Sequence, residues 1–270
     1  MSGTSTVYTH GHQEAVLRSH RSRGAADSAA YLLPELRPGQ ALLDVGCGPG
    51  TITADLAELV GPSGRVVAVD TSAEVLEQAA EYVAGRGLSN VVFEVADVHR
   101  LSYRDGEFDV VHAHQVLQHV ADPVGALREM RRVLAPGGVV AARDVDYASM
   151  TWYPEAPALD DWLALYRRTA RANGGEPDAG RRLLSWARAA GFAEVAATAT
   201  TWTFATPERC AWWGGMWADR TVDSAFARTA VAAGFADRAE LERIAAGWRE
   251  WSGAGDAWFS MLHGEVLARG

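Results

Sequence analysis

Cysteine is scarce in this sequence, with only Cys47 and Cys210 among 270 residues. Two cysteines cannot build a disulfide framework or a cysteine zinc cluster, so proteins held together by either are excluded. Long hydrophobic runs are also missing, because no stretch approaches the roughly 20 apolar residues that span a membrane. The opening segment MSGTSTVYTHGHQE lacks the apolar core of a signal peptide. We therefore expect a cytoplasmic protein without membrane insertion.

Basic residues are outnumbered by acidic ones. The chain carries 25 Lys and Arg residues against 34 Asp and Glu residues, which gives a net charge of −9. A phosphate backbone attracts basic surfaces, so this balance predicts no nucleic-acid partner. The hydrophobic content of 48% is typical of a globular protein, and the length is sufficient to bury a substantial core. These properties indicate one globular domain with additions.

The segment LLDVGCGPGT, residues 42–51, joins a short apolar strand to a glycine loop that opens a helix. Glycines at alternate positions let a ligand approach the loop backbone, because they have no side chains. Apolar residues at helical spacing follow in 52–60, so the loop amides lie at a helix N-terminus. The loop is therefore a candidate ligand-binding site, with Asp44 at its start.

A similar turn binds the pyrophosphate of dinucleotides, so an oxidoreductase that uses NAD(P) is one alternative. The dinucleotide fingerprint requires GxGxxG, whereas the glycines here run GxGxG. Pro49 removes one amide donor, and Asp44 is poorly placed for an anion. An acid beside the loop instead suits a ligand with a cationic end. A second alternative is a module that binds the cofactor without catalysis, since a fold does not determine a function.

Four more segments follow at intervals of about one strand plus one helix. They are RVVAVDTS (65–72), FEVADVHRL (93–101), FDVVHAHQVLQHV (108–120) and LREMRRVLAPGGVVAARD (127–144). Together with the glycine loop they resemble the class I S-adenosylmethionine-dependent methyltransferases, particularly small-molecule members similar to the ubiquinone and menaquinone methyltransferases. The resemblance covers residues 36–145 and implies S-adenosyl-L-methionine as the cofactor. It also implies a Rossmann-like α/β sheet of seven strands in the order 3-2-1-4-5-7-6, with the last strand antiparallel.

The resemblance implies a set of cofactor-binding residues. Asp70 would hold both ribose hydroxyls, as the two acceptor oxygens of a carboxylate can do. Asp97 would face the exocyclic amine of adenine, and backbone around His114 would receive the methionine amine. The expected set in the matching segments is Asp44, Gly46, Cys47, Gly48, Asp70, Thr71, Asp97, Val98, His114 and Gln115. The acids end successive apolar runs, which places them along the carboxyl edge of one parallel sheet, where open α/β folds bind ligands.

Two insertions, 146–176 and 206–256, interrupt the second half of the chain. A predicted sixth strand over 195–205 lies between them, and a last strand over 258–268 follows. Both insertions leave from carboxyl ends of parallel strands, so we expect helical caps over the cofactor. Seven of the ten tryptophans lie in these caps and indicate a small apolar or aromatic acceptor, unless they only form the cap core. The expected substrate-binding residues are Asp146, Trp152, Trp213 and Trp217.

The polar segment 1–24 is either a disordered leader or a flap that closes over the bound cofactor. The rest of the chain, 25–270, is the expected methyltransferase domain with its caps. In similar methyltransferases an aromatic residue and an arginine upstream of the first motif cover the site and pair with the methionine carboxylate. Tyr8 and Arg23 match by order, with Arg21 as the alternative. Arginine suits this role because its guanidinium binds a carboxylate through two hydrogen bonds.

Histidines gather around the end of the fourth predicted strand, where His112 and His114 share one strand face and His119 follows a turn later. Imidazoles at this spacing can share a metal ion, but methyl transfer needs none and no nearby carboxylate completes a ligand set, so we expect no metal. His119 is the first candidate for a base that deprotonates the acceptor, and Asp144 or Asp146 is the next. The methylated atom (carbon, oxygen or nitrogen) stays open, as does homodimer formation.

Overall fold

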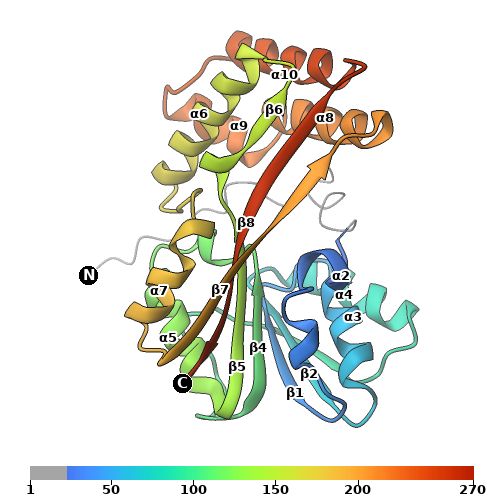
Figure 1. Ribbon diagram of the computed structural model, residues 1–270, viewed down its shortest axis with the longest axis vertical. Helices are drawn as coiled ribbons and strands as arrows, with labels where there is room; N and C mark the ends of the chain where they lie inside the picture. The colour runs from blue at the N-terminus through green and yellow to red at the C-terminus, as the bar shows by residue number, and fades with distance from the viewer. Residues whose placement is uncertain (1–22) are drawn as a thin grey trace.

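The computed structural model describes residues 23–270, which form one mixed sheet with helices on both faces (Figure 1). Its strands are β1 (Ala41–Val45), β2 (Arg65–Asp70), β3 (Val91–Val95), β4 (Phe108–His114), β5 (Leu134–Val145), β6 (Thr151–Tyr153), β7 (Glu194–Phe204) and β8 (Trp258–Arg269). The order is β3-β2-β1-β4-β5-β8, and both β6 and β7 also pair with β8. The first five strands are parallel, whereas β8 is antiparallel to β5. The predicted order is confirmed, with β7 and β8 as its sixth and seventh strands and β6 as a short addition.

Helices fill the connections between strands. The α-helices are α2 (Ala25–Ser28), α3 (Thr51–Val60), α4 (Ala73–Gly85), α5 (Pro123–Val133), α6 (Pro157–Ala172), α7 (Leu183–Ala189), α8 (Pro207–Val222), α9 (Ala225–Ala232) and α10 (Arg238–Ser252). Short 3-10 turns are η1 (Leu33–Glu35), η2 (Leu117–His119), η3 (Tyr147–Ser149) and η4 (Gly180–Arg182). Within residues 23–270, none of these helices combines the length and apolar character needed to cross a membrane.

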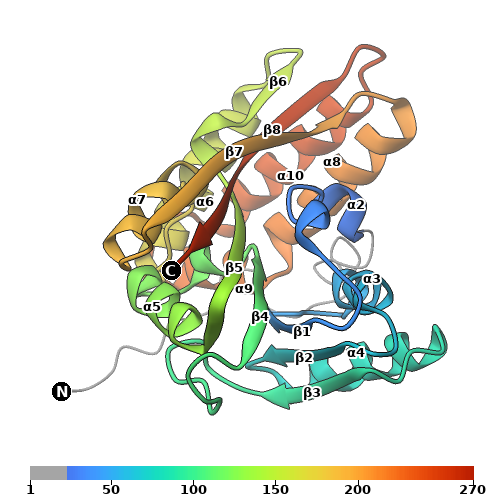
Figure 2. The same ribbon diagram turned by 60° about the horizontal axis from the view of Figure 1, so that its bottom comes forward.

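The central strands are buried on both faces, as expected for a parallel sheet covered by helices. Successive side chains of β1 point to opposite faces, so Leu42 packs among residues of α2 and α3 while Leu43 packs among residues of α5 and α7. Figure 2 shows these two helix layers on either side of the sheet. This three-layer packing explains why strand segments here read as nearly continuous apolar runs.

The last strand, β8, connects the sheet to the cap region. Its second half, from His263 to Ala268, pairs with β5, while its first half pairs with β6 beyond the end of β5. β7 follows β8 along almost its full length. The two long strands therefore extend past the parallel part of the sheet, and α6, α8 and α10 pack in the region that they reach (Figure 1). The bounds of β7 and β8 agree with the predicted strands 195–205 and 258–268, whereas β6 has only three residues and no sequence pattern indicated it.

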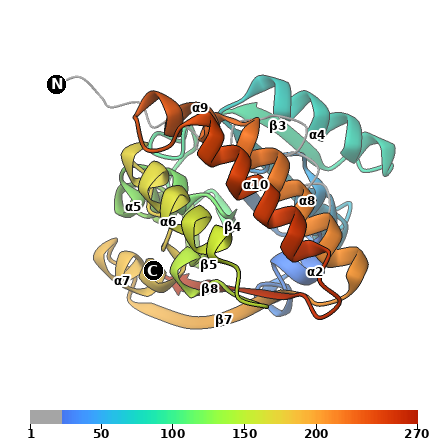
Figure 3. The same ribbon diagram turned by 90° about the horizontal axis from the view of Figure 1, so that it is seen from above.

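The insertions 146–176 and 206–256 contain α6 and α8 to α10, whose helices pack closely (Figure 3). Close approach is possible because glycine lies at the crossings: a Cβ added to Gly247 would lie 2.2 Å from the Ala158 Cβ. The interior between the helices is aromatic. The Trp162 ring centroid lies 4.5 Å from that of Trp217 and 4.9 Å from that of Trp248. All three tryptophans are fully buried, so they form a core for the cap.

Candidate functional site

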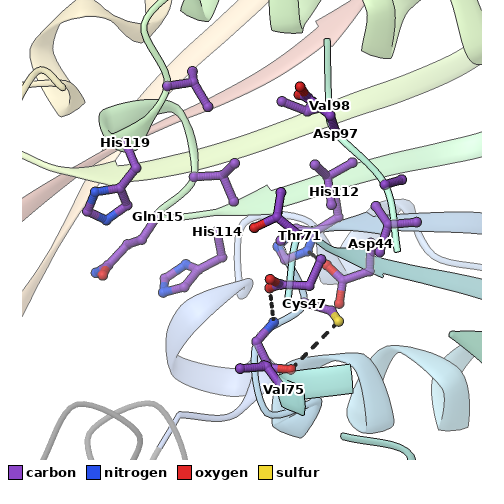
Figure 4. Close-up of a pocket in the computed structure, with 18 of the residues that line it drawn as sticks. Asp44, Cys47, Thr71, Val75, Asp97, Val98, His112, His114, Gln115 and His119 are labelled. Atoms are coloured by element: carbon purple, nitrogen blue, oxygen red, sulfur yellow. Dashed lines mark hydrogen bonds and ion pairs between the residues drawn. The ribbon is translucent and has the colours of Figure 1, made fainter. Parts of the chain in front are cut away.

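A cavity of about 620 Å³ opens at the carboxyl ends of β1, β2 and β4 (Figure 4). Cavities of this size are typical of small-molecule sites. Every predicted cofactor-binding residue that the structure describes lies on its wall: Arg23, Asp44, Gly46, Cys47, Gly48, Asp70, Thr71, Asp97, Val98, His114 and Gln115. His119 also lines it. Tyr8, Arg21 and residues 1–22 of the expected flap lie outside the described residues. The structure thus brings the predicted residues together, while their roles stay predictions.

The glycine loop between β1 and α3 is held by β2. The amides of Gly46 and Cys47 donate to the Val69 carbonyl at 2.7 and 3.0 Å, and the Gly48 amide donates to the Asp70 carboxylate at 3.2 Å. Gly48 has a φ of +54°, which favours glycine. A Cβ added to Gly48 would meet no protein atom within 4 Å, and Gly48 lines the cavity. A ligand can therefore lie directly against the loop backbone.

Asp70 ends β2 with its carboxylate engaged on both sides. Its Oδ2 accepts the Gly48 amide, and its Oδ1 accepts the Ser72 amide at 3.1 Å. A carboxylate offers about four lone-pair sites, so each oxygen keeps capacity for another hydrogen bond. The two backbone contacts fix the orientation of the group. This arrangement suits recognition of two adjacent hydroxyls, as predicted for the ribose.

Asp97 and Val98 lie at the next position along the sheet edge. The Asp97 carboxylate is 66% exposed and accepts the backbone amide of His99 at 2.9 Å. This backbone hydrogen bond lowers the pKa of Asp97, and the nearby His99 ring acts in the same direction. The other His99 ring nitrogen, Nε2, lies 3.2 Å from the Asp122 carbonyl. An ionised acceptor beside buried, apolar Val98 suits an aminopurine edge, and His99 is an addition that motif comparison did not supply.

Asp44, the acid of the first motif, is almost completely buried. Its Oδ2 accepts a hydrogen bond from the Thr53 hydroxyl at 2.6 Å, and its Oδ1 lies 2.7 Å from Nδ1 of His112. His112 is also buried and lines the cavity. We weighed His112 only as a metal ligand from the sequence. The signal that identifies its partner is strand register, since Asp44 and His112 lie side by side on the paired strands β1 and β4.

Three further polar side chains follow β4. His114, Gln115 and His119 lie together on one side of the cavity in Figure 4, apart from Asp44, Cys47 and Thr71. Burial lowers the pKa of His114 well below the ordinary value, and the Arg143 guanidinium adds to this effect. The imidazole is therefore neutral at pH 7 and can donate and accept hydrogen bonds.

Gln115 is held in a left-handed backbone conformation, with a φ of +55°. Its backbone amide donates to the Arg143 carbonyl at 2.7 Å, and its side-chain Nε2 lies 3.0 Å from Nε2 of His263. His263 lies on β8, far along the chain, and is fully buried. Non-glycine residues with positive φ are uncommon and persist where the surrounding structure fixes them. No sequence signal pointed to His263, because its contact with Gln115 depends on the β5–β8 pairing.

His119 is the first of the three candidates for a base. Burial lowers the pKa of His119 to about 3, with a further contribution from the Arg23 guanidinium. An imidazole with this pKa is a weak base at neutral pH, because an effective base has a pKa near the working pH. The role of His119 in deprotonating the acceptor therefore stays a prediction that its lowered pKa does not favour, and His119 lines the cavity as expected.

Asp144 and Asp146 were the next candidates, and neither lines the cavity. Asp144 is fully buried and accepts the Gln118 amide at 3.1 Å, while burial raises its pKa to about 7. Asp146 is also buried and forms two hydrogen bonds with Arg181, at 2.5 and 2.9 Å. Asp144 therefore anchors the turn that carries His119, and Asp146 anchors the segment around η4.

The predicted substrate-binding tryptophans do not line the cavity either. Trp213 and Trp217 are buried in the cap core, where Trp213 stacks on Phe204 at a centroid distance of 4.2 Å. Trp152 is half-buried and stacks on Phe259 at 6.0 Å. This packing matches the alternative use of these residues, a cap core, and their assignment as substrate contacts stays a prediction. The same residue type fills cores and lines pockets, so composition could not separate the two uses.

Residues 23–270 show neither an activated cysteine nor a metal-binding cluster. Burial raises the pKa of the Cys47 thiol well above its ordinary value, so the group stays protonated rather than becoming a thiolate. Both cysteines are unpaired. This part of the chain contains no group of three or more His, Cys, Asp or Glu side chains placed to hold a metal ion.

Comparison with known proteins agrees with this geometry. The family of methyltransferase domains matches residues 36–193. An uncharacterized methyltransferase of Schizosaccharomyces pombe is 32% identical over 96% of this chain and 95% of its own length. A demethylmenaquinone methyltransferase of Staphylococcus aureus is 37% identical over 48% of this chain and 51% of its own. The structure of a phosphoethanolamine N-methyltransferase of Haemonchus contortus in complex with S-adenosyl-L-methionine has a TM-score of 0.54, with 17% identity over 89% of this chain and 51% of that one.

The sheet order and the acid-lined cavity beside a glycine loop define a Rossmann-like methyltransferase. The family match spans more than half of the chain, and the yeast relative aligns with nearly all of it. The chain belongs to the methyltransferase-domain family and is an enzyme of that class. Nothing in the comparisons or the site favours an NAD(P)-dependent oxidoreductase.

Proposed function

We propose that this protein transfers a methyl group from S-adenosyl-L-methionine to a small-molecule acceptor. The observation that carries the proposal is the row of carboxylates at the ends of three parallel strands. Asp44, Asp70 and Asp97 come from β1, β2 and the segment after β3, and all three line one cavity beside the glycine loop. Acidic groups along the cavity suit a ligand with a cationic sulfonium and ammonium, whereas a pyrophosphate would be repelled.

The residues present fit this cofactor. Asp70 presents two oriented oxygens for a diol, and Asp97 with Val98 presents an acceptor and an apolar surface for adenine. Arg23 also lines the cavity, and its guanidinium suits the amino-acid carboxylate. When bound, S-adenosyl-L-methionine supplies a methyl group that is electrophilic because it is attached to a sulfonium. The protein then has to align the acceptor with that methyl group and exclude water, for which proximity alone contributes roughly 7 to 11 kcal/mol.

The acceptor end of the cavity is the side that bears His114, Gln115 and His119. These are neutral hydrogen-bonding groups, and apolar Val116 and Val120 lie on the same wall. This mixture supports a small acceptor that has an apolar body and at least one polar group. Because the cap tryptophans are packed into their own core, they no longer support an aromatic acceptor in particular. Because burial lowers the pKa values of His114 and His119, an acceptor atom that is nucleophilic without deprotonation fits this side of the cavity best.

The proposal is tested by following the methyl group. Purified protein is incubated with S-adenosyl-L-methionine carrying a radiolabelled methyl group and a panel of small alcohols, phenols, amines and carboxylic acids. We expect label in at least one acceptor, and we expect Asp70→Asn to lose most of the transfer. Asp105→Asn is the matched control, because that carboxylate is exposed and lies outside the cavity. Equal transfer by both variants, or labelling of no acceptor in the panel by wild type, would count against the proposal.

A further inference from the structure

His112 and Asp44 form a buried pair beneath the glycine loop. His112 is fully buried on β4, and its Nδ1 lies 2.7 Å from Oδ1 of Asp44. The second carboxylate oxygen of Asp44 accepts the Thr53 hydroxyl from α3 at 2.6 Å. Both oxygens of the acid are thus occupied by protein groups. These two contacts fix the orientation of Asp44, and His112, which also lines the cavity, keeps one ring nitrogen for a ligand.

The hydrogen bond to Asp44 determines which nitrogen of His112 carries the proton. An ionised carboxylate can only accept, so Nδ1 of His112 must be the donor. In the neutral ring the other nitrogen, Nε2, is then an acceptor. This Nε2 is buried and has no hydrogen-bond partner in residues 23–270, although the ring lies on the cavity wall. A buried acceptor without a donor is unfavourable, so the cavity should supply one when it is filled.

The ligand group that suits this acceptor follows from the positions of the other residues. Asp70 and Asp97 account for the ribose and the adenine along β2 and β3. His112 instead lies beside β1, next to Asp44 at the start of the glycine loop. At this end the amino-acid part of the cofactor would lie, and its ammonium is the available donor. A histidine that accepts from an ammonium and donates to a buried carboxylate also places negative charge behind the cationic group.

We propose that Nε2 of His112 accepts a hydrogen bond from the ammonium of the bound S-adenosyl-L-methionine, with Asp44 fixing the required tautomer. This inference rests on the proposed function and adds a residue to it, because motif comparison assigned the amine only to backbone around His114. His112 is here a cofactor-binding residue, and Asp44 and Thr53 are positioning residues that act through it.

The test compares two ligands that differ only in the amine. Binding of S-adenosylhomocysteine and of its analogue with hydrogen in place of the amino group is measured by calorimetry on wild type and His112→Phe. We expect wild type to prefer the amine-bearing ligand by roughly tenfold to a hundredfold, as for hydrogen bonds to charged groups. His112→Phe keeps a ring of similar size but has no nitrogen, so it should bind both ligands with nearly equal affinity. Tyr103→Phe is the matched control, because that ring lies outside the cavity, and it should keep the preference.

The outcomes separate this inference from the proposed function. If wild type binds neither ligand, the proposed function fails; if wild type binds both ligands equally, only the role of His112 fails. A preference that survives in His112→Phe, or an equal loss of affinity for both ligands, would also overturn that role. Should His112→Phe not fold, nitrogen NMR of wild type supplies the answer. We expect His112 as the Nδ1–H tautomer without ligand, and a shift of its Nε2 resonance with S-adenosylhomocysteine but not with the analogue.

Discussion

At the level of single residues, the buried carboxyl group of Asp144 makes stability depend on pH. Burial raises its pKa to about 7, whereas an unfolded aspartate has a pKa near 3.9. Below about pH 3.9 the carboxyl is protonated in both the folded and the unfolded state, so it does not change the free energy of unfolding. As pH rises from about 4 to 7, only the unfolded state loses its proton, so the free energy of unfolding falls. The difference between the two pKa values corresponds to roughly 4 kcal/mol.

We therefore expect Asp144→Asn to gain stability relative to wild type as pH rises. The amide can still accept the Gln118 amide proton through its oxygen, and it never ionises. The difference in melting temperature between variant and wild type should shift in favour of the variant from pH 5 to pH 8. Thermal unfolding followed by circular dichroism at both pH values measures it. A difference that does not change with pH would show that Asp144 ionises as easily in the folded protein as in the unfolded chain.

Buried histidines act in the opposite pH range, which is why the comparison uses a difference between variants. Burial lowers the pKa values of His114, His119 and His263 below the ordinary value of 6.5. Above pH 6.5 these rings are neutral in both states. When pH falls below 6.5, the histidines of the unfolded chain bind protons, whereas the buried histidines of the folded protein do not. The free energy of unfolding therefore falls as the pH is lowered. Both Asp144→Asn and wild type share this loss, and it cancels.

At the scale of elements, the strands and the glycine loop were predictable because several local signals agree there. Buried parallel strands leave continuous apolar runs, and the acids Asp44, Asp70 and Asp97 mark where the runs end. The extension formed by β6 and β8 left no such signal, since its register depends on pairing between distant segments. Contacts such as Gln115 with His263 were unpredictable for the same reason.

Two glycines of the same loop should respond differently to a methyl group. At Gly48 a Cβ meets open cavity, whereas at Gly50 it would lie 2.9 Å from the Ala79 Cβ and 3.2 Å from the Ala79 Cα. Both have positive φ, so each alanine costs roughly 1 to 2 kcal/mol of backbone strain. Gly50→Ala adds a clash between α3 and α4 and should melt at a clearly lower temperature than Gly48→Ala.

Binding should show the reverse order of effects. Gly48→Ala places its methyl group in the space that a ligand would occupy, so its affinity for S-adenosyl-L-methionine should fall by more than that of any folded Gly50→Ala protein. Differential scanning fluorimetry with and without the ligand measures both effects on the same samples. An unchanged ligand-induced shift in Gly48→Ala would mean that the ligand does not lie against this loop.

At the scale of the whole molecule, the sheet and the cap have separate hydrophobic cores. Large clusters of buried residues lie on the two faces of the parallel sheet, and another fills the space between α6, α8 and α10. The tryptophans belong to the cap cluster, which explains their concentration in the two insertions. The sequence located them correctly but could not reveal which way they face, because a buried core and a ligand pocket both attract aromatic side chains.

A substitution at Trp217 tests whether the cap core is separate from the ligand cavity. Trp217→Ala should lower the free energy of unfolding by roughly 3 to 5 kcal/mol, the usual cost of emptying a core aromatic site. Its affinity for S-adenosyl-L-methionine should change little, since Trp217 does not line the cavity. Trp258→Ala is the control, because that side chain is 38% exposed and should affect stability much less. Chemical unfolding measures the stability of both variants, and calorimetry measures their affinity for S-adenosyl-L-methionine. If Trp217→Ala lost binding but kept its stability, Trp217 would be a ligand contact instead.

The central claim is that the acid-lined cavity at the carboxyl edge of the sheet binds S-adenosyl-L-methionine. Titration calorimetry of the full chain with S-adenosyl-L-methionine and, separately, with NAD tests it most directly. We predict one molecule of S-adenosyl-L-methionine bound per chain, no detectable heat with NAD, and an affinity for S-adenosyl-L-methionine about tenfold or more weaker in Asp70→Asn. Binding of NAD in place of S-adenosyl-L-methionine, or equal affinity in wild type and Asp70→Asn, would contradict the claim.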